Sequence, residues 1–355
     1  MKKILGAGPA GLCAAINLAK GGEQVTVFEK RADVGLRFPA NLQGIKYIND
    51  PREFMKEMGL GAKVDFRYFS KVIFGTRSRD IELDTGQHKK IPFVERGGRR
   101  SLEYALFKEA EKLGAAFRFN SREAPSACDI IAAGGSGCDF AALGGIYEDS
   151  DFPRDRLLVV FDDRYSPKGW YSYIFPISKD QIEFVNCVSQ PHVPKLFALT
   201  NKAIRERKIL RDFLGGKKKI SAFGGSGTVR VPKTGYSGGK ILIGEAAGFQ
   251  DPFMGFGIKY ALMSGKLCAD AILQGKDYEA LWRSAILPDM KKDLARRLPL
   301  SLFGDSVVEF FMRKHRNGAI VDISNAAPER FPLYWLIENL FFEAERLKFG
   351  LTGRW

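Results

Sequence analysis

Six residues near the start of the chain have the types and spacing of a phosphate-binding turn. Gly6-Ala7-Gly8-Pro9-Ala10-Gly11 follows the short apolar stretch Lys3-Ile4-Leu5 and precedes an Ala- and Leu-rich stretch, 12–20. In a G-x-G-x-x-G turn the first glycine permits the tight turn, the second lets a pyrophosphate approach the backbone, and the third lets helix and strand pack closely. Free N–H groups at the start of the following helix attract phosphate. The pattern predicts a strand–turn–helix unit that binds a dinucleotide.

An acidic residue completes this unit at the end of the next expected strand. Residues 24–28 form that strand, and Glu29 follows it. A carboxylate in this position accepts hydrogen bonds from the ribose hydroxyls of an adenosine. We also assign Lys30 and Arg37 to the cofactor site, because Arg37 belongs to an irregular stretch, 31–49, and loops of this length are usually functional.

A second glycine-rich stretch occurs much later in the chain. Gly244 and Glu245 follow the expected strand 240–243, and Gly255-Phe256-Gly257 precedes an expected helix that starts at Ile258. The N-terminus of a helix stabilises a developing anion, and in a flavin that anion is the N1/C2=O end of the reduced ring. This stretch therefore predicts a site that makes a flavin easier to reduce, with Glu245 near the phosphate–ribityl linker. The alternative is a buried strand–helix turn that needs small residues for packing.

The expected cofactor site thus combines the two glycine-rich turns, their neighbours, and a glycine that follows the buried strand 129–133. Its members are Gly6, Gly8, Pro9, Ala10, Gly11, Glu29, Lys30, Arg37, Gly134, Gly244, Glu245, Gly255, Phe256, Gly257 and Ile258.

Aromatic residues are concentrated in one expected strand, 170–175, within a region of antiparallel character. Trp170, Tyr171, Tyr173, Phe175 and the following Pro176 are assigned to the wall of a substrate cavity. An apolar slot with few polar groups suits an apolar chain, although the same residues also suit an ordinary core sheet. Tyr171 or Tyr173 is the candidate proton donor. The alternative is a wall residue whose hydroxyl bonds solvent or backbone.

The composition argues against several other classes of protein. The chain has 355 residues, 45% of them hydrophobic, and no run of about 18 apolar residues that would predict a membrane-spanning helix. The five cysteines contain no C-x-x-C pair and the three histidines are far apart, so we expect no metal site and reduced thiols in a cytoplasm. The chain begins directly on its first expected strand, which leaves no room for a signal peptide.

The net charge of +14 predicts an anionic partner, unless it serves only solubility. The candidates are a diphosphate or phospholipid head, an acidic electron donor and a membrane face. Nucleic acid is not expected, because no recognition motif accompanies the charge. The aromatic stretch 331–342 adds a candidate peripheral membrane contact, its alternative being a helix packed on the substrate domain or at a dimer interface.

Three motifs together resemble the FAD proteins of the glutathione reductase type: the turn 6–11, Arg99 before Leu102-Glu103, and the run 244–248. Within that group they resemble the p-hydroxybenzoate hydroxylase superfamily, and most closely the geranylgeranyl reductases and FixC-like dehydrogenases. The stretch 171–176 is similar to the aromatic Y-x-W-x-F-P motif of that family. The resemblance covers roughly residues 1–275. It implies FAD as the cofactor, with Arg99 on the pyrophosphate side.

The resemblance implies an α/β fold. We expect a Rossmann-like FAD-binding domain, an inserted antiparallel-sheet substrate domain and a helical C-terminal region. The expected ranges are 1–66, 96–148 and 233–288 for the FAD-binding domain, 67–95 and 149–232 for the substrate domain, and 289–355 for the C-terminal region.

The implied activity is reduction of carbon–carbon double bonds in a geranylgeranyl-type lipid or diphosphate by hydride from reduced flavin, with NAD(P)H or ferredoxin as electron donor. The alternatives are a flavin monooxygenase of an apolar substrate and a FAD electron-transfer or non-redox protein. Gly134-Gly135-Ser136 replaces the Asp-Gly motif of the aromatic hydroxylases, which argues against NADPH-driven hydroxylation. The stretch 34–39 also lacks the cysteine that the archaeal reductases carry in this loop.

Overall fold

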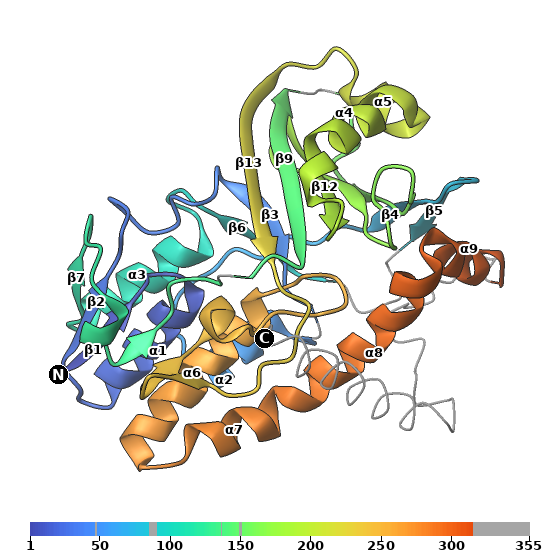
Figure 1. Ribbon diagram of the computed structural model, residues 1–355. Helices are drawn as coiled ribbons and strands as arrows, with labels where there is room; N and C mark the ends of the chain where they lie inside the picture. The colour runs from blue at the N-terminus through green and yellow to red at the C-terminus, as the bar shows by residue number, and fades with distance from the viewer. Residues whose placement is uncertain (47, 85–90, 136, 149–150, 315–355) are drawn as a thin grey trace.

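Two sheets and the helices packed on them form the part of the chain that the computed structural model describes: residues 1–46, 48–84, 91–135, 137–148 and 151–314. Figure 1 shows the N-terminal nucleotide-binding unit at the lower left and the larger sheet rising above it. None of the helices in these ranges has the length and apolar character needed to cross a membrane. The aromatic stretch 331–342 lies outside the described residues.

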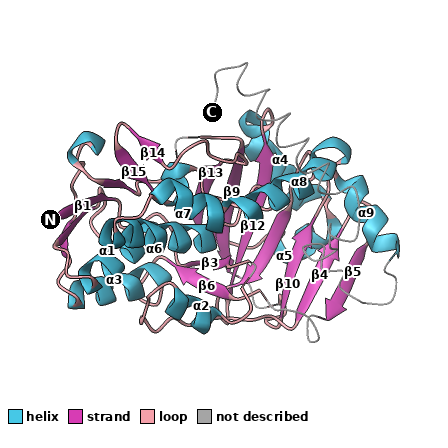
Figure 2. Ribbon diagram, turned by 90° about the horizontal axis from the view of Figure 1, so that it is seen from below, coloured by secondary structure: helices cyan, strands magenta, loops and turns pink. Residues whose placement is uncertain are grey.

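The first sheet contains the strand–helix–strand unit that the N-terminal pattern predicts, with β1 and β2 parallel and α1 between them in the chain. Its strands, in spatial order, are β14 (Tyr236–Ser237), β15 (Lys240–Leu242), β8 (Ile130–Ile131), β1 (Lys2–Leu5), β2 (Val25–Phe28) and β7 (Ala116–Arg118). All neighbours are parallel except β14 and β15. The helices α1 (Pro9–Lys20), α3 (Leu102–Lys112) and α6 (Ile258–Gln274) pack together beside it, as Figure 2 shows.

Small residues let α1 and α6 approach closely. A Cβ added at Gly265 of α6 would lie 2.5 Å from the carbonyl oxygen of Ala10 in α1, so no larger residue fits there. The α1 sequence is rich in Ala and Leu, which favour helix, and Pro9 occupies its first turn, where a missing N–H costs nothing. The two helices that begin at the predicted glycine-rich turns are thereby fixed against each other.

The second sheet has seven strands and forms the substrate side. In spatial order they are β13 (Lys219–Gly227), β9 (Phe140–Glu148), β12 (Gln181–Ser189), β11 (Ser172–Pro176), β10 (Arg156–Val160), β4 (Lys71–Gly75) and β5 (Asp80–Asp84). The helices α4 (Leu196–Glu206) and α5 (Lys208–Leu214) cover one face with a packed core. A small ribbon of β3 (Asn41–Gly44) and β6 (Phe93–Arg96) joins the two halves, and α2 (Pro51–Glu57) follows β3.

The α/β fold predicted from sequence is confirmed, with two differences in the second sheet. The strand β9 pairs with β12 and β13, so residues 140–148 belong to the larger sheet and not to the FAD-binding range 96–148 in which we expected them. The sheet is antiparallel except for β10 and β4, which are parallel. Both differences arise from pairings between segments far apart in the chain, which no local pattern specifies.

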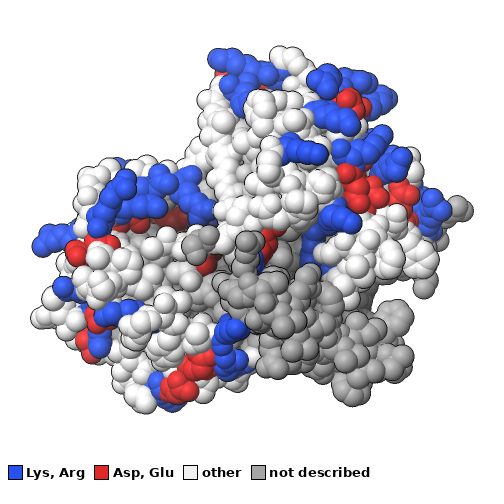
Figure 3. All heavy atoms as spheres, in the orientation of Figure 1, with Lys and Arg blue, Asp and Glu red and all other residues white. Residues whose placement is uncertain are grey.

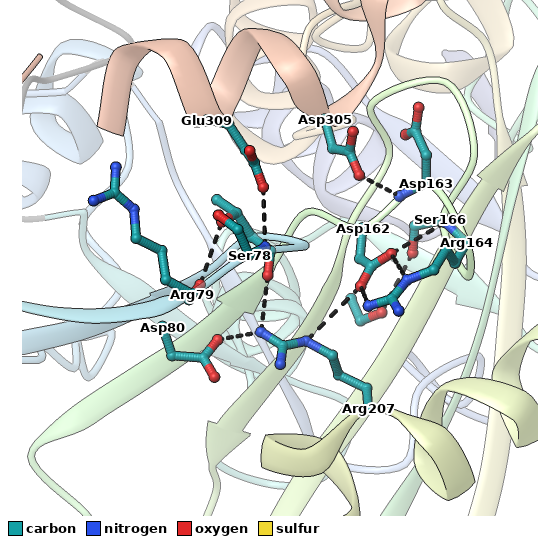
Figure 4. A network of polar contacts seen from close by, with 12 residues as sticks. Ser78, Arg79, Asp80, Asp162, Asp163, Arg164, Ser166, Arg207, Asp305 and Glu309 are labelled. Carbon is teal, nitrogen blue, oxygen red and sulfur yellow. Dashed lines mark hydrogen bonds and ion pairs between the residues drawn. The ribbon is translucent and has the colours of Figure 1, made fainter. Parts of the chain in front are cut away.

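The C-terminal helices extend along the lower side of the molecule to its right edge in Figure 1. They are α7 (Tyr278–Ala285), α8 (Leu287–Phe303) and α9 (Asp305–Lys314), so the described part of the predicted C-terminal region is helical. A polar network tethers α9 to the larger sheet, as Figure 4 shows: the Asp163 amide donates to Asp305 at 3.0 Å, and the Ser78 amide donates to Glu309 at 3.0 Å. This tether holds α8 and α9 across the open end of the sheet.

Candidate cofactor and substrate site

One cavity of about 1250 Å³ lies between the two sheets and is lined by both. Most of the predicted cofactor residues line it: Gly6, Gly8, Pro9, Ala10, Glu29, Lys30, Arg37, Gly134, Gly244, Glu245, Gly255, Phe256, Gly257 and Ile258. Pockets for drug-sized ligands measure about 300–1,000 Å³, so this cavity has room for more than one ligand. The two glycine-rich turns, far apart in sequence, therefore meet at one site.

The first turn has the backbone geometry of a phosphate cradle. Gly6 has φ of +107°, and a Cβ there would lie 2.5 Å from the carbonyl oxygen of Ala132. A Cβ at Gly11 would lie 2.1 Å from the carbonyl oxygen of Gly6, so Gly11 serves helix–turn packing and does not line the cavity. A Cβ at Gly8, by contrast, meets no atom within 4 Å. The space beside Gly8 is open to a ligand.

The start of α1 leaves its first N–H groups available to that ligand. The residue before the helix, Gly8, provides no side-chain cap, and uncapped N–H groups at a helix N-terminus bind anions. Beside them, the two carboxylate oxygens of Glu29 accept from the Ala7 and Arg31 amides, each at 3.0 Å. These bonds fix the Glu29 carboxylate at the cavity wall. Among the described residues no Lys or Arg side chain pairs with it, so its remaining lone pairs can accept hydrogen bonds from a ligand. The residues present fit the ADP half of FAD.

The second turn presents another uncapped helix N-terminus. Gly257 precedes α6 without a side-chain cap, and the loop before it is held by backbone bonds between Asp251 and Phe256 (2.8 Å) and between Gly255 and Asp251 (2.9 Å). Glu245, in the short 3-10 helix Gly244–Ala247, pairs with Arg37 at 3.1 Å. This geometry fits the predicted flavin end of the cofactor, with α6 directed at the ring.

The opposite wall is aromatic and aliphatic, as predicted, but two assigned residues stand behind it. Tyr171, Tyr173 and Phe175 line the cavity, whereas Trp170 and Pro176 do not. Trp170 is 1% exposed, stacks on Phe140 at 4.3 Å between ring centroids, and lies under the Arg297 guanidinium. It is a core residue that supports the wall. The aliphatic part of the lining includes residues of β3, β4, β10, β12, α8 and α9: Leu42, Val72, Leu157, Val159, Val185, Leu298, Leu300, Val307 and Val308.

The two candidate tyrosines have different environments. The Tyr171 hydroxyl donates to the carbonyl oxygen of Met254 at 2.6 Å, and burial raises its pKa well above the ordinary value. Tyr173 also has a strongly raised pKa, mainly from burial, but its hydroxyl donates to no described residue. Tyr171 is thus tied to the backbone, and Tyr173 is the tyrosine whose hydroxyl is available in the cavity.

Arg99 does not line the cavity, contrary to the position that the resemblance implies. It is exposed and its guanidinium donates to the Tyr104 hydroxyl at 2.7 Å. Arg96 lines the cavity instead, where its guanidinium donates to Glu103 at 2.6 Å and lies over the Phe38 ring. Arg99 was chosen because it lies just before helix α3 in the sequence. In the structure it is Arg96, the last residue of β6, that lines the cavity.

A buried charged cluster beside the second turn was missed from the sequence. The Lys46 ammonium donates to Asp251 at 2.9 Å and lies 3.7 Å from Asp293, and all three side chains are at most 7% exposed. Lys46 also lines the cavity, with its ammonium over the Phe253 ring. It belongs to the irregular stretch 31–49, whose length was the signal for function, although nothing in that stretch indicated its distant carboxylate partners.

Comparisons with known proteins agree with this geometry. A family of NAD(P)-binding Rossmann-like domains matches residues 4–46, from β1 to just beyond β3. A solved geranylgeranyl bacteriochlorophyll reductase-like protein from Thermoplasma acidophilum is similar, with a TM-score of 0.73 and 18% identity over 94% of this chain and 96% of that one. A solved flavin-dependent brominase is similar with a TM-score of 0.65 and 15% identity, over 97% of this chain and 98% of that one.

A curated relative adds a match at the sequence level. Digeranylgeranylglycerophospholipid reductase 2 of Methanothermobacter thermautotrophicus is 25% identical over 188 residues, 49% of this chain and 46% of that protein. The matched segment therefore spans about half the length of that relative. The comparisons confirm the predicted resemblance to the geranylgeranyl reductases, and the chain has the fold of FAD-dependent oxidoreductases. Because a reductase-like protein and a brominase share this fold, the fold alone does not select the reaction.

Proposed function

We propose that this protein is a FAD-dependent oxidoreductase that reduces carbon–carbon double bonds of an isoprenoid-like substrate. The observation that carries the proposal is one continuous cavity whose two ends differ in chemistry. One end is built from glycine backbone and helix N-termini, which suit a dinucleotide. The other end is built from aromatic and aliphatic side chains, which suit an apolar chain.

The cofactor end supplies the positions that FAD needs. Gly8 and the start of α1 would hold the pyrophosphate, Glu29 the ribose, and Glu245 the ribityl linker, with Gly257 and the start of α6 beside the ring. Reduced FAD supplies the hydride that such a reduction requires. The chain itself has to supply the proton, and Tyr173 is the proposed donor because the Tyr171 hydroxyl is bound to Met254.

A basic surface supports an anionic partner. Figure 3 shows Lys and Arg side chains gathered at the upper end of the molecule, where α4, α5 and β13 lie in the same view of Figure 1. Its exposed members include Arg205, Lys208, Arg211, Lys218 and Lys219. We propose that this surface attracts an acidic electron donor such as ferredoxin. A reduction rate that falls steeply with salt when ferredoxin is the donor, and not when NAD(P)H is the donor, would support this proposal.

An anaerobic half-reaction tests the proposed function. The purified flavoprotein is reduced with dithionite, geranylgeranyl lipids or diphosphates are added, and the oxidised flavin band is followed. Return of the band without oxygen, together with products heavier by pairs of hydrogens, supports reduction of the isoprenoid. A flavin that stays reduced with every such substrate counts against it.

The second candidate is a flavin-dependent oxygenation of an apolar substrate, with which the same apolar cavity end is compatible. That reaction needs oxygen, so a flavin that is reoxidised only on admission of air, with substrate-dependent oxygen consumption, would select it. A third candidate is an electron-transfer or non-redox FAD protein. It predicts no change of flavin redox state with any substrate under either condition.

A further inference from the structure

A buried carboxyl lies directly behind the substrate wall. The cavity-lining residues Val185 and Cys187 alternate along β12, and Glu183 is the next residue in the same row, because side chains two apart in a strand share a face. Glu183 is 0% exposed and is not part of the described cavity lining. The ribbon strand β3 covers it, through Asn41 and Leu42, which themselves line the cavity.

The hydrogen bonds around Glu183 are incomplete for a carboxylate. Its Oε2 accepts from the Leu42 amide at 2.6 Å, and the Asn41 side chain contributes a further bond. Its Oε1 is buried without a partner, and so is the Oδ1 of Asn41. A buried anion with an unpaired oxygen is costly. A proton on Oε1 would remove the charge and turn that oxygen into a donor, for which the Asn41 oxygen is an acceptor.

No positive charge in the described structure compensates Glu183. The charged groups on the neighbouring ribbon strand β6 are Glu95 and Arg96, and the Arg96 guanidinium is bonded to Glu103. The titratable groups on the adjoining strands are Tyr173 on β11 and Tyr147 and Glu148 on β9, and Cys187 lies on β12 itself. Burial raises the pKa values of Tyr173, Tyr147 and Cys187. Burial raises the pKa of Glu183 to about 8, although its two hydrogen bonds act in the opposite direction. A bound proton, rather than a neighbouring cation, therefore neutralises the Glu183 carboxylate.

Tyr173 lies beside Glu183 on the same face of the sheet. In the register of β11 and β12, Tyr173 lies opposite Val185 and Phe175 lies opposite Glu183, so Tyr173 and Glu183 are diagonal neighbours on one face, within reach of long side chains. The charge of Glu183 is one of the causes of the raised pKa of Tyr173. Tyr171 precedes β11, two residues before Tyr173, and its hydroxyl donates to the Met254 carbonyl oxygen.

We propose that Glu183 is the internal proton reserve of this site and acts through Tyr173. The proposal rests on the proposed reduction of a double bond. As hydride adds to one carbon, the Tyr173 hydroxyl gives its proton to the other, and the phenolate takes the proton of the Glu183 carboxyl. Glu183 is left as a carboxylate and regains a proton from solvent before the next turnover. Each reduced bond thus consumes one hydride and one proton, and no other reactant is needed.

The protonation state of Glu183 is measured without any substrate. Infrared spectra of the wild-type protein over a pH series report the carbonyl stretch of a protonated carboxyl. We expect one such band that survives above the ordinary carboxyl range and disappears with a midpoint near pH 8. The band should be missing from Glu183→Gln and retained in Glu148→Gln, an exposed glutamate on the same sheet. A wild type without the band at neutral pH would overturn the proposal, whether or not the variants fold.

The proton-supply role is measured in the anaerobic half-reaction. Because general acids typically contribute about 10²–10⁴-fold, we expect Tyr173→Phe to slow reoxidation by about 100-fold and Glu183→Gln by about tenfold, with loss of the pH dependence near 8 in both. Combining the two substitutions should add nothing to Tyr173→Phe. If wild type reacts and Glu183→Gln keeps both its rate and its pH profile, the reserve role is wrong and the reductase stands. If no isoprenoid reoxidises the reduced wild-type flavin, the proposed reductase function is wrong. The infrared spectra then still decide whether Glu183 is protonated at neutral pH.

Discussion

The two halves of the cavity are built from different kinds of group. The cofactor half presents backbone: the open space at Gly8, the uncapped starts of α1 and α6, and one carboxylate, Glu29, fixed by two amides. The substrate half presents side chains from strands β11 and β12 and helices α8 and α9. Backbone recognition suits a ligand whose phosphates and hydroxyls are fixed in place. A wall of side chains suits an apolar ligand that needs shape and exclusion of water.

Two buried glutamates show how the halves treat charge. Glu103 is 1% exposed and is paired with Arg96 at 2.6 Å, beside the cofactor half. Glu183 is 0% exposed, has no ion pair in the described structure, and lies behind the substrate half. The first has a counter-charge at hydrogen-bond distance, while burial without a counter-charge raises the pKa of the second to about 8. Beside the cofactor half a buried carboxyl is paired with an arginine, whereas behind the substrate half a buried carboxyl is neutralised by its own proton.

Substitution of Gly8 has the largest expected effect on the cofactor half. A glutamate there directs a negative side chain into the open space where the phosphates are expected, so Gly8→Glu should purify without FAD. The measurement is the ratio of flavin to protein absorbance. Because a Cβ at this position meets no protein atom within 4 Å, the circular dichroism spectrum and the thermal unfolding of the variant should match those of wild type from which FAD has been removed. A variant with full FAD content would show that the cofactor half has been misplaced.

The protonated Glu183 carboxyl should make the stability of the protein depend on pH. The folded-state pKa of Glu183, about 8, lies above its ordinary value of 4.5, so the folded protein holds a proton that the unfolded chain releases between these values. The stability from neutral Glu183 is complete below about pH 4.5 and is lost as the pH rises through about 8. The slope is at most about 1.4 kcal/mol per pH unit.

Urea unfolding of wild type and Glu183→Gln at several pH values measures this pH-dependent contribution of Glu183 to the free energy of unfolding. The free energy of unfolding of wild type, relative to the variant, should fall steadily as the pH rises from acid to mildly alkaline. A difference that does not change with pH, or one that increases, would contradict the assignment of Glu183 as a neutral acid.

Gly11→Ala tests packing within the cofactor half. The added Cβ would lie 2.1 Å from the carbonyl oxygen of Gly6, so α1 has to shift, at a cost of about 1–3 kcal/mol in unfolding free energy. Gly61→Ala is the matched control, because its Cβ comes no closer than 3.4 Å to Glu109, and its stability should be close to wild type. Equal stability of the two variants would contradict the close approach of turn and helix.

The smallest effect on stability is expected from the tyrosines of the substrate half. Tyr171→Phe loses the hydrogen bond to Met254 and should destabilise the protein by about 1 kcal/mol. Tyr173→Phe loses no hydrogen bond to a described residue, so its thermal unfolding should match wild type while its rate falls. If Tyr173→Phe were the destabilised variant and Tyr171→Phe the slow but stable one, the available hydroxyl would belong to Tyr171.

The cofactor half was largely predictable from sequence because its information is local. Gly6, Gly8 and Gly11 act within one turn, and Glu29 follows the next strand, so their spacing alone specified the geometry. Arg99 does not line the cavity as expected, because Arg96, three residues earlier at the end of β6, does so instead. The pairing of β6 with β3 positions Arg96, and the local sequence does not reveal that pairing.

The substrate half was predictable in kind but not in detail. The aromatic strand indicated a wall, yet the separation of Tyr173 in the cavity from Trp170 in the core depends on the stacking of Trp170 on Phe140 of β9. The role of Glu183 depends on its cover by β3, a contact across 141 residues of sequence. Alternation along β12 gives the face of Glu183, but its burial results from tertiary packing.

Isotope incorporation tests the central claim most directly. The dithionite-reduced protein is mixed with a geranylgeranyl lipid in deuterated water under anaerobic conditions, and the product is analysed by mass spectrometry. Reduction with a proton from an exchangeable acid predicts products in which every reduced bond carries at least one solvent deuterium on carbon, together with recovery of the oxidised flavin band. An unchanged lipid and a flavin that stays reduced until air is admitted would contradict the account.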